Sequence, residues 1–175
     1  RLAVLGAVRR LEPATGDDVQ PYLFGMAADR WLALRSGSIY AMLQSLRRES
    51  LIEADPTEPT RHVVTAAGRK EHDRLLVQAL RVLPETGDTS ELRVALHFAD
   101  LLPAETVRRA LTDRLAAIED ALGDITARIA EAGPGASNPY VTHRAGLEHA
   151  LLRAQAEWLR NLLDQVLTPR RSRSR

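Results

Sequence analysis

The side chains best suited to catalysis or metal binding do not come together in this sequence. The chain has five histidines, at positions 62, 72, 97, 143 and 149. No two of them are four residues apart, the spacing that would place two metal ligands on one face of a helix. His143 and His149 are six apart and fall on different faces of a helix. We therefore expect no metal site.

Other catalytic arrangements are also missing from the pattern. Asp120 and Asp124 could share a helix face, but both lie outside the neighbouring apolar stripe and face water, which does not suit them to acid–base catalysis. There is no cysteine to act as a nucleophile. The GPG at 133–135 has no lysine after it, so it is not a phosphate-binding loop. We expect no enzymatic activity and no cofactor.

The strongest chemical signal is a pair of arginines, Arg47 and Arg48, that ends a predicted helix over residues 36–49. The stretch 37–52 reads GSIYAMLQSLRRESLI, with apolar residues at 39, 42, 43 and 46 that form one buried stripe. Ser36 is placed to cap it. The opposite face carries no carboxylate before Glu49. A solvated helix usually mixes both signs of charge, so this face is predicted to meet an anion.

The surrounding elements give this helix a recognisable setting. A helix is predicted over 2–11, and a second one follows Thr15, with either a kink at Pro21 or a start nearer to it. After the third helix, Leu51-Ile52 and His62–Val64 are two short β-prone runs around a proline-containing loop. Thr65 then caps a helix over about 66–83. This order is that of a winged helix-turn-helix domain, whose third helix enters the DNA major groove.

The second half of the chain reads as helical. PETGDTS at 84–90 is the clearest boundary, followed by predicted helices at 91–102, 104–132 and 140–168. The last helix has two apolar stripes, one more than a single packing surface requires. A second copy of the chain would cover the other stripe, because most soluble oligomers are homo-oligomers. The fold class is thus mainly α, with a winged helix-turn-helix domain at 1–83 and an α-helical dimerisation domain at 84–168.

Charge is distributed unevenly along the 175 residues. Residues 1–83 carry a net charge of +2, residues 84–169 a net charge of −5, and the tail at 170–175 a net charge of +4. The first part suits an anion better than the second. We expect the basic tail, 169–175, to be a disordered end or a non-specific phosphate binder. No stretch reaches the length of a membrane span and no secretory signal is visible, so we expect a soluble, cytoplasmic protein.

The sequence resembles the PadR-like transcriptional regulators. The resemblance is carried by GSIYAMLQSLRRESLI followed by VTAAGRKEH, which are similar to that family's pattern of glycine-serine-any-tyrosine, leucine-two-leucine, glycine-leucine, then threonine-two-glycine. LHFADLLPAE and HRAGLEHALLRAQAEWLRNLL are similar to its C-terminal dimerisation region. The resemblance implies a homodimeric repressor on a pseudo-palindromic operator in double-stranded DNA. In some members a small aromatic effector releases the DNA.

The chain departs from the family pattern at three places. Gly16-Asp17 stands where the family has glycine-tyrosine, Ser50 where it has glycine, and His62 where it has an aromatic residue. Asp17 puts an acid near the predicted DNA side. The other two are expected to be local packing variants.

Two sets of candidate site residues follow. The DNA-binding candidates are Ser36, Ser38, Tyr40, Gln44, Arg47, Arg48, Arg61 and Lys70. Gln44 suits an adenine edge and the arginines suit phosphates, while Tyr40 could instead pack its ring under the wing and Arg61 could be a free surface residue. The dimer or effector candidates are Leu151, Ala154, Trp158, Leu162 and Trp31, of which the two tryptophans could equally fill a core.

One alternative function remains open. The winged fold could serve as a protein-interaction adaptor that dimerises without binding DNA. Asp17, Asp18 and the small net charge of residues 1–83 favour that interpretation.

Overall fold

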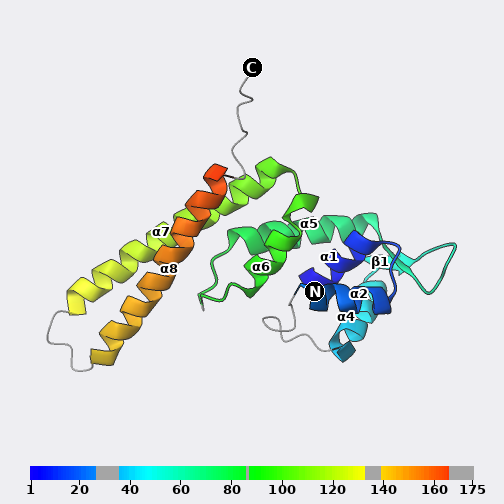
Figure 1. Ribbon diagram of the computed structural model, residues 1–175, viewed down its shortest axis with the longest axis horizontal. Coiled ribbons are helices and arrows are strands. Elements are labelled where there is room, and N and C mark those ends of the chain that lie inside the picture. The colour runs from blue at the N-terminus through cyan, green and yellow to red at the C-terminus, as the bar shows by residue number, and fades with distance from the viewer. Residues whose placement is uncertain (27–35, 86, 133–138, 166–175) are drawn as a thin grey trace, which may run out of the picture. The chain divides into compact units, whose positions relative to one another are not determined.

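The computed structural model describes residues 1–26, 36–85, 87–132 and 139–165 (Figure 1). These residues form two compact units. The first consists of Arg1–Leu80 and Thr89–Leu102, and the second of Arg81–Asp88 and Pro103–Arg175. Each unit is described by itself below.

The first unit is built around α1 (Leu2–Leu11), which is apolar on almost every side. Five of its apolar residues are buried, namely Ala3, Val4, Leu5, Ala7 and Val8. A helix that is hydrophobic all round lies inside a core rather than at its edge. Accordingly, α1 packs against α2, α4, β2 and α6. Its bounds are those that the sequence predicts.

The second helix, α2 (Gly16–Gly25), begins with a reciprocal capping box. The Thr15 hydroxyl accepts the Asp18 backbone N–H at 3.2 Å, and the Asp18 carboxylate accepts the Thr15 backbone N–H at 2.9 Å. These two bonds satisfy orphan donors of the first turn. They explain why the helix begins at Gly16. Pro21 lies inside the helix, so the expectation of a start nearer to Pro21 is wrong.

The third described helix, α4 (Ser36–Arg48), ends in a Schellman motif. The Leu51 N–H donates to the Leu46 carbonyl at 2.9 Å, and the Ser50 N–H donates to the Arg47 carbonyl at 3.0 Å. Ser50 has a φ of 58°, the left-handed conformation that this motif requires. This is where the PadR-like pattern has glycine, so the departure at Ser50 concerns backbone conformation as well as packing.

The predicted wing is present. Strands β1 (Ile52–Ala54) and β2 (His62–Val64) pair antiparallel with Ile52 opposite Val64, and His62 also forms a bridge with Ala14. The loop between the strands extends away from the helices of this unit (Figure 1). Thr65 then caps α5 (Ala66–Arg81) by accepting the Gly68 N–H at 3.0 Å. Both the wing and the cap therefore agree with the sequence interpretation.

The first unit also contains a segment that the sequence assigns to the second domain. Helix α6 (Ser90–His97) and the short 3-10 helix η1 (Ala99–Leu101) occupy the predicted 91–102 region. The fully buried Phe98 ring lies 6.4 Å from Tyr22 and 5.8 Å from His72, both in the first unit. The structure thus differs from the predicted division at 83/84, because Phe98 completes the core of the first unit.

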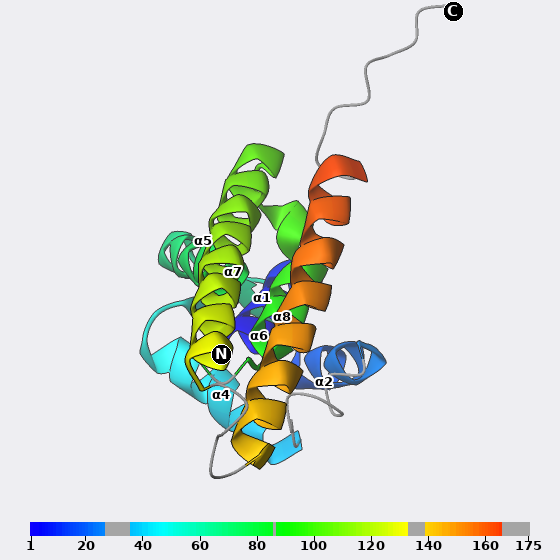
Figure 2. The ribbon, with the colours of Figure 1, turned by 90° about the vertical axis from the view of Figure 1, so that its left-hand side faces the viewer.

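The second unit is dominated by α7 (Ala104–Ala132) and α8 (Pro139–Gln165), which lie side by side (Figure 2). The face of α7 toward the unit interior includes Leu111, Ile118 and Ile125, and α8 contributes Leu152 and Leu159. α7 has the range that the sequence predicts. No helix among the described residues is long and apolar enough to cross a membrane.

Candidate nucleic-acid interface

The exposed face of α4 is the site that the sequence analysis singles out. Its buried side is formed by Ile39, Leu43 and Leu46. The exposed residues on the opposite side are Gly37, Tyr40, Ala41, Gln44, Arg47 and Arg48. At about 100° per residue these positions fall within an arc of roughly 120°. The helix therefore presents one continuous polar face, to be called the α4 face.

Arg47 and Arg48 are exposed at the C-terminal end of the α4 face. Within the described part of the chain, neither side chain forms an ion pair. Six other arginines of the first unit are ion-paired, namely Arg1, Arg9, Arg10, Arg61, Arg69 and Arg74. The contrast matters, because an arginine already paired with a carboxylate has less to offer a phosphate.

Gln44 and Ser38 lie on exposed positions of α4, as the sequence predicts. Gln44 forms no hydrogen bond with any described residue, so its amide oxygen and its amide NH2 are both open to a ligand. Ser36 is the first residue of α4, and its side chain lies outside the described part of the structure.

Tyr40 is held by the start of α2. Its hydroxyl donates to the Asp17 carboxylate. Its ring covers Gly16, where an added Cβ would lie 2.4 Å from Tyr40 Cε1. The hydrogen bond to Asp17 raises the pKa of Tyr40. This contact differs from both roles considered from the sequence, which were contact with DNA and packing under the wing.

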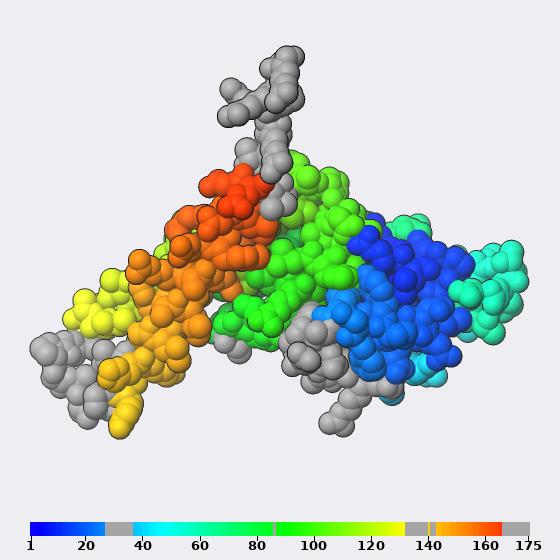
Figure 3. Space-filling view, in the orientation of Figure 1, coloured from blue at the N-terminus to red at the C-terminus, as the bar shows by residue number. Residues whose placement is uncertain are grey.

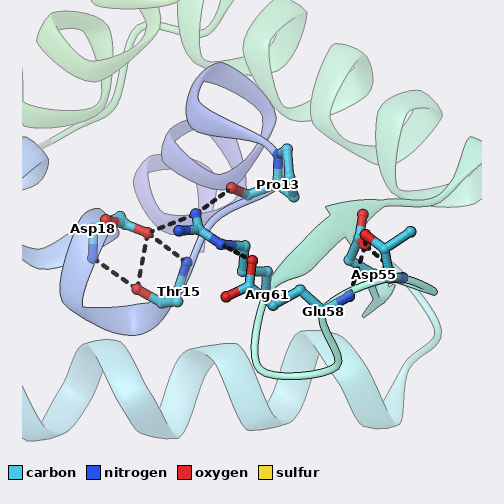
Figure 4. Close-up of polar contacts among 7 residues, drawn as sticks. Pro13, Thr15, Asp18, Asp55, Glu58 and Arg61 are labelled. Carbon is cyan, nitrogen blue, oxygen red and sulfur yellow. Dashed lines mark hydrogen bonds and ion pairs between the residues drawn. The ribbon is translucent and has the colours of Figure 1, made fainter.

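Arg61 is bound within its own unit (Figure 4). Its guanidinium donates to the Glu58 carboxylate at 2.7 Å and to the Pro13 carbonyl at 3.0 Å, and it lies 3.4 Å from the Asp18 carboxylate. It therefore ties the wing loop to the start of α2. These three groups use its Nε and Nη1 atoms, and because two of them are carboxylates, Arg61 has less to offer a flanking phosphate than an unpaired arginine has.

The wing loop is ordered by Asp55, which accepts the backbone N–H groups of Thr57 at 2.8 Å and Glu58 at 3.0 Å. These bonds lower the pKa of Asp55, with the Thr57 hydroxyl as the largest contributor. Residues 53–61 carry three carboxylates and one arginine, a net charge of −2. An acidic wing is poorly suited to lie along a phosphate backbone.

The start of α5 offers a further cation beside the end of α4. The Thr65 hydroxyl donates to the Ser50 carbonyl at 2.8 Å, which fixes the first turn of α5 against the last turn of α4. Lys70 is exposed and has no ion-pair partner among the described residues. Arg69 differs, because it is paired with Glu12. Lys70 is thus the better phosphate candidate of the two.

The dimer and effector candidates of α8 lie on its exposed side. Leu151 is 64% exposed and Trp158 is 43% exposed, with Ala154 exposed between them and Leu162 half-buried. Much of α8 lies at the surface of its unit (Figure 3). Trp31 lies outside the described residues. These exposures show that Trp158 does not fill the core of its own unit.

A cleft of about 510 Å³ lies between α7 and α8. It is lined by Ala121, Asp124, Ile125, Ala127, Arg128, Glu131 and Glu148. None of the predicted effector residues belongs to this lining. Among the described residues there is also no cluster of three or more metal-ligating side chains.

The most perturbed histidine lies away from the α4 face. His72 is fully buried, and Arg9 donates to its Nδ1 at 3.0 Å. Because arginine can only donate, Nδ1 accepts, and the ring proton is on Nε2. Burial and the Arg9 charge lower the pKa of His72 to about 4. His72 thus serves the core of the first unit as a neutral side chain.

The contacts that Asp17 and Gly16 make with Tyr40 were not predicted from the sequence. From the sequence, Asp17 is an acid near the predicted DNA side and supports the adaptor function, whereas in the structure it accepts the Tyr40 hydroxyl. The one local signal was the glycine before it, because a glycine in the first turn of a helix often marks a close approach by another side chain.

No protein-family model matches the chain, and no curated protein matches it. The chain is similar to the crystal structure of Bacillus subtilis PadR in complex with p-coumaric acid. The identity is 24%, the alignment covers 93% of this chain and 95% of that chain, and the TM-score is 0.41. The winged-helix class follows from the chain's own order of elements.

Proposed function

We propose that this chain is a sequence-specific DNA-binding transcriptional regulator that acts as a repressor. The observation that carries the proposal is the α4 face, with Gln44, Arg47 and Arg48 exposed on the third helix of a winged helix-turn-helix. In that fold the third helix is the one that enters the major groove. The PadR-like sequence motif supports the same function.

The exposed residues of α4 differ in the chemistry that they offer to DNA. Gln44 is suited to pair with an adenine edge in the major groove, and Ser38 with a base or a phosphate. Arg47 and Arg48 contact phosphates, because most protein–DNA hydrogen bonds go to the backbone. Lys70 adds a phosphate contact from α5. Arg61 is proposed to hold the wing in place and not to contact the DNA, since Glu58, Asp18 and the Pro13 carbonyl already bind it.

Binding of the unsubstituted chain to its own upstream DNA tests this function. Fluorescence anisotropy would compare a duplex from the upstream region with a random-sequence duplex of equal length, at two salt concentrations. The proposal expects salt-sensitive binding to both and tighter binding to the upstream duplex. Absence of binding to either duplex at low salt would contradict it.

We further propose that two chains form a homodimer through α8. Leu147, Leu151, Ala154 and Trp158 follow one another at steps of 4, 3 and 4, the spacing of a coiled-coil seam. Leu147 and Leu151 are both more than 60% exposed, so this seam is not used within the chain's own second unit. A second copy would bury it. The two α4 helices would then reach half-sites about 34 Å apart on a pseudo-palindromic operator.

The dimer proposal is tested by Leu151→Glu. Because Leu151 is exposed in its own unit, the variant should fold but sediment as a monomer and lose affinity for the two-half-site duplex. Gln165→Glu adds the same charge near the end of α8 and is the matched control. A Leu151→Glu protein that sediments like the unsubstituted chain would contradict this use of the seam.

A small aromatic effector that stacks near Trp158 is a further part of the proposal. p-Coumaric acid, the compound in the similar PadR structure, is the probe we would titrate first. Quenching of tryptophan emission in the unsubstituted chain, but not in Trp158→Phe, would support the site. Equal quenching in both proteins would place the compound elsewhere.

The adaptor function has one observation in its favour. Helix α2 and strand β1 both contact α4, and α2 and the wing carry five carboxylates, namely Asp17, Asp18, Glu53, Asp55 and Glu58. These negative charges would repel a phosphate backbone and suit a basic protein partner. A DNA-binding assay of the double variant Arg47→Ala/Arg48→Ala distinguishes the two functions. The variant should bind DNA more weakly if the chain is a regulator, whereas an adaptor has no DNA binding to lose.

A further inference from the structure

The contact between Tyr40 and the start of α2 lies at the N-terminal half of the proposed recognition helix. Tyr40 is on the first half of α4, and Asp17 is the second residue of α2. The hydroxyl donates to the carboxylate, and the ring lies over Gly16. The contact therefore joins the two helices of the helix-turn-helix through one exposed side chain.

This contact adds direction to the apolar packing that holds α4. Ile39, Leu43 and Leu46 pack the buried side of α4, but apolar contacts are not directional. The Schellman motif at Ser50 and the Thr65 hydroxyl fix the C-terminal end of α4 against α5. At the other end, the Tyr40–Asp17 hydrogen bond is a directional contact between α4 and α2.

The space around Gly16 makes the arrangement specific. An added Cβ at Gly16 would approach Tyr40 Cε1 to 2.4 Å and Tyr40 Cδ1 to 3.0 Å. The ring therefore needs a glycine beneath it to reach Asp17. Once there, its hydroxyl points at a protein carboxylate, and its hydrogen is not available to a base.

We propose that Asp17 is a specificity-determining positioning residue, which holds Tyr40 against α2 and thereby fixes the angle at which the α4 face meets base edges. This inference rests on the proposed function. It assigns Tyr40 a role through Asp17 and not as a direct reader of DNA. Asp17 thus has a structural role, as a hydrogen-bond acceptor, that its negative charge near the DNA does not suggest.

The inference predicts how single variants change sequence preference, defined as affinity for the upstream duplex divided by affinity for the random duplex. Tyr40→Phe and Asp17→Ala each lose one hydrogen bond. Each should lower the preference by about 2- to 10-fold, the range expected for one exposed hydrogen bond. The double variant should lower it no further than either single change, because both remove the same contact.

Asp17→Asn separates the hydrogen bond from the charge. The amide oxygen can still accept the Tyr40 hydroxyl, so the preference should be retained. Loss of the negative charge should raise affinity for both duplexes alike at low salt. Tyr22→Phe, which removes a hydroxyl that contacts His97 at 2.9 Å, and Asp113→Ala, which removes an exposed carboxylate on α7, are matched controls.

A second readout requires no DNA. The Asp17 hydrogen bond raises the pKa of Tyr40, so an NMR titration of ring-labelled tyrosine should show that pKa falling in Asp17→Ala. Loss of preference in Tyr40→Phe with none in Asp17→Ala would show that Tyr40 reads DNA directly and would overturn the inference. Unchanged preference in both would also overturn it, whereas no DNA binding by the unsubstituted chain would overturn the proposed function together with it.

Discussion

The backbone N–H of Leu51 donates to the carbonyl of Leu46 at 2.9 Å, and this bond turns the chain from α4 into the wing. Both side chains are buried, and they stand at the two positions whose apolar side chains often accompany a Schellman motif. Between them Ser50 takes a φ of 58°. The end of the proposed recognition helix is thus set by backbone bonds and apolar packing together.

Replacing Ser50 by glycine should stabilise the protein. A residue with a Cβ costs about 1–2 kcal/mol in the left-handed conformation, and glycine avoids this at an entropic cost of about 0.5–1 kcal/mol. We expect Ser50→Gly to raise the free energy of unfolding by up to about 1 kcal/mol. Urea denaturation measures it, with Ser50→Ala as a control that should change stability little. A destabilised Ser50→Gly protein would show that the hydroxyl matters more than the backbone.

Gly68 should not tolerate a side chain. An added Cβ would lie 1.9 Å from the Leu51 carbonyl oxygen, so α5 would have to move away from the turn after α4. We expect Gly68→Ala to lower the free energy of unfolding by about 2–3 kcal/mol or more. Gly123→Ala is the matched control, because nothing lies within 4 Å of its added Cβ in the middle of α7. That variant should be stabilised by up to about 1 kcal/mol. Equal thermal stability of the two variants would contradict the close approach.

His72 should make stability fall with decreasing pH. Its pKa is about 4 in the folded protein and 6.5 when unperturbed, so the unfolded chain binds the proton more readily between these values. The stabilisation is present above pH 6.5 and is lost as pH falls toward 4. At pH 5 we expect the free energy of unfolding to be about 2 kcal/mol lower than at pH 8 from this group.

His72→Asn tests that dependence, because its amide oxygen can still accept from Arg9. The variant should be less stable at neutral pH but should show a shallower pH dependence between pH 5 and 8. Burial also lowers the pKa values of His62 and His97, so part of the dependence will remain. An unchanged slope in urea titrations of His72→Asn would assign the effect to other groups.

Arg61 should support the wing without contributing to salt-dependent DNA binding. Arg61→Ala removes the bonds to Glu58 and to the Pro13 carbonyl, so amide hydrogen exchange in the wing loop should speed up. The salt dependence of DNA binding should remain that of the unsubstituted chain. A shallower salt dependence in Arg61→Ala would show that Arg61 contacts a phosphate, as the sequence suggested.

Local signals predicted most of the fold. Thr15 and Thr65 marked two helix starts correctly because capping depends on residues three positions apart. The apolar spacing of α7 gave its range directly. The boundary at 83/84 did not anticipate α6, because the contacts of Phe98 with Tyr22 and His72 join residues far apart in the sequence.

The candidate site was also predictable only in part, because some of its contacts join residues far apart in the sequence. The exposed positions of Gln44, Arg47 and Arg48 follow from helical periodicity. The partners of Tyr40 and Arg61 do not, since Asp17 is 23 residues from Tyr40 and Asp18 is 43 residues from Arg61. Such contacts depend on how α2, α4 and the wing pack, which no short pattern encodes.

The salt dependence of binding to the upstream duplex tests the central claim most directly. It would be measured for the unsubstituted chain, for Arg47→Ala/Arg48→Ala, and for Arg74→Ala/Arg93→Ala as a control that removes two exposed arginines from other helices. If Arg47 and Arg48 each hold a phosphate, the slope of log K against log salt should become shallower by about 1.8 per chain in the first variant only. A slope that is unchanged in that variant, or that changes equally in the control, would contradict α4 as the DNA-binding helix.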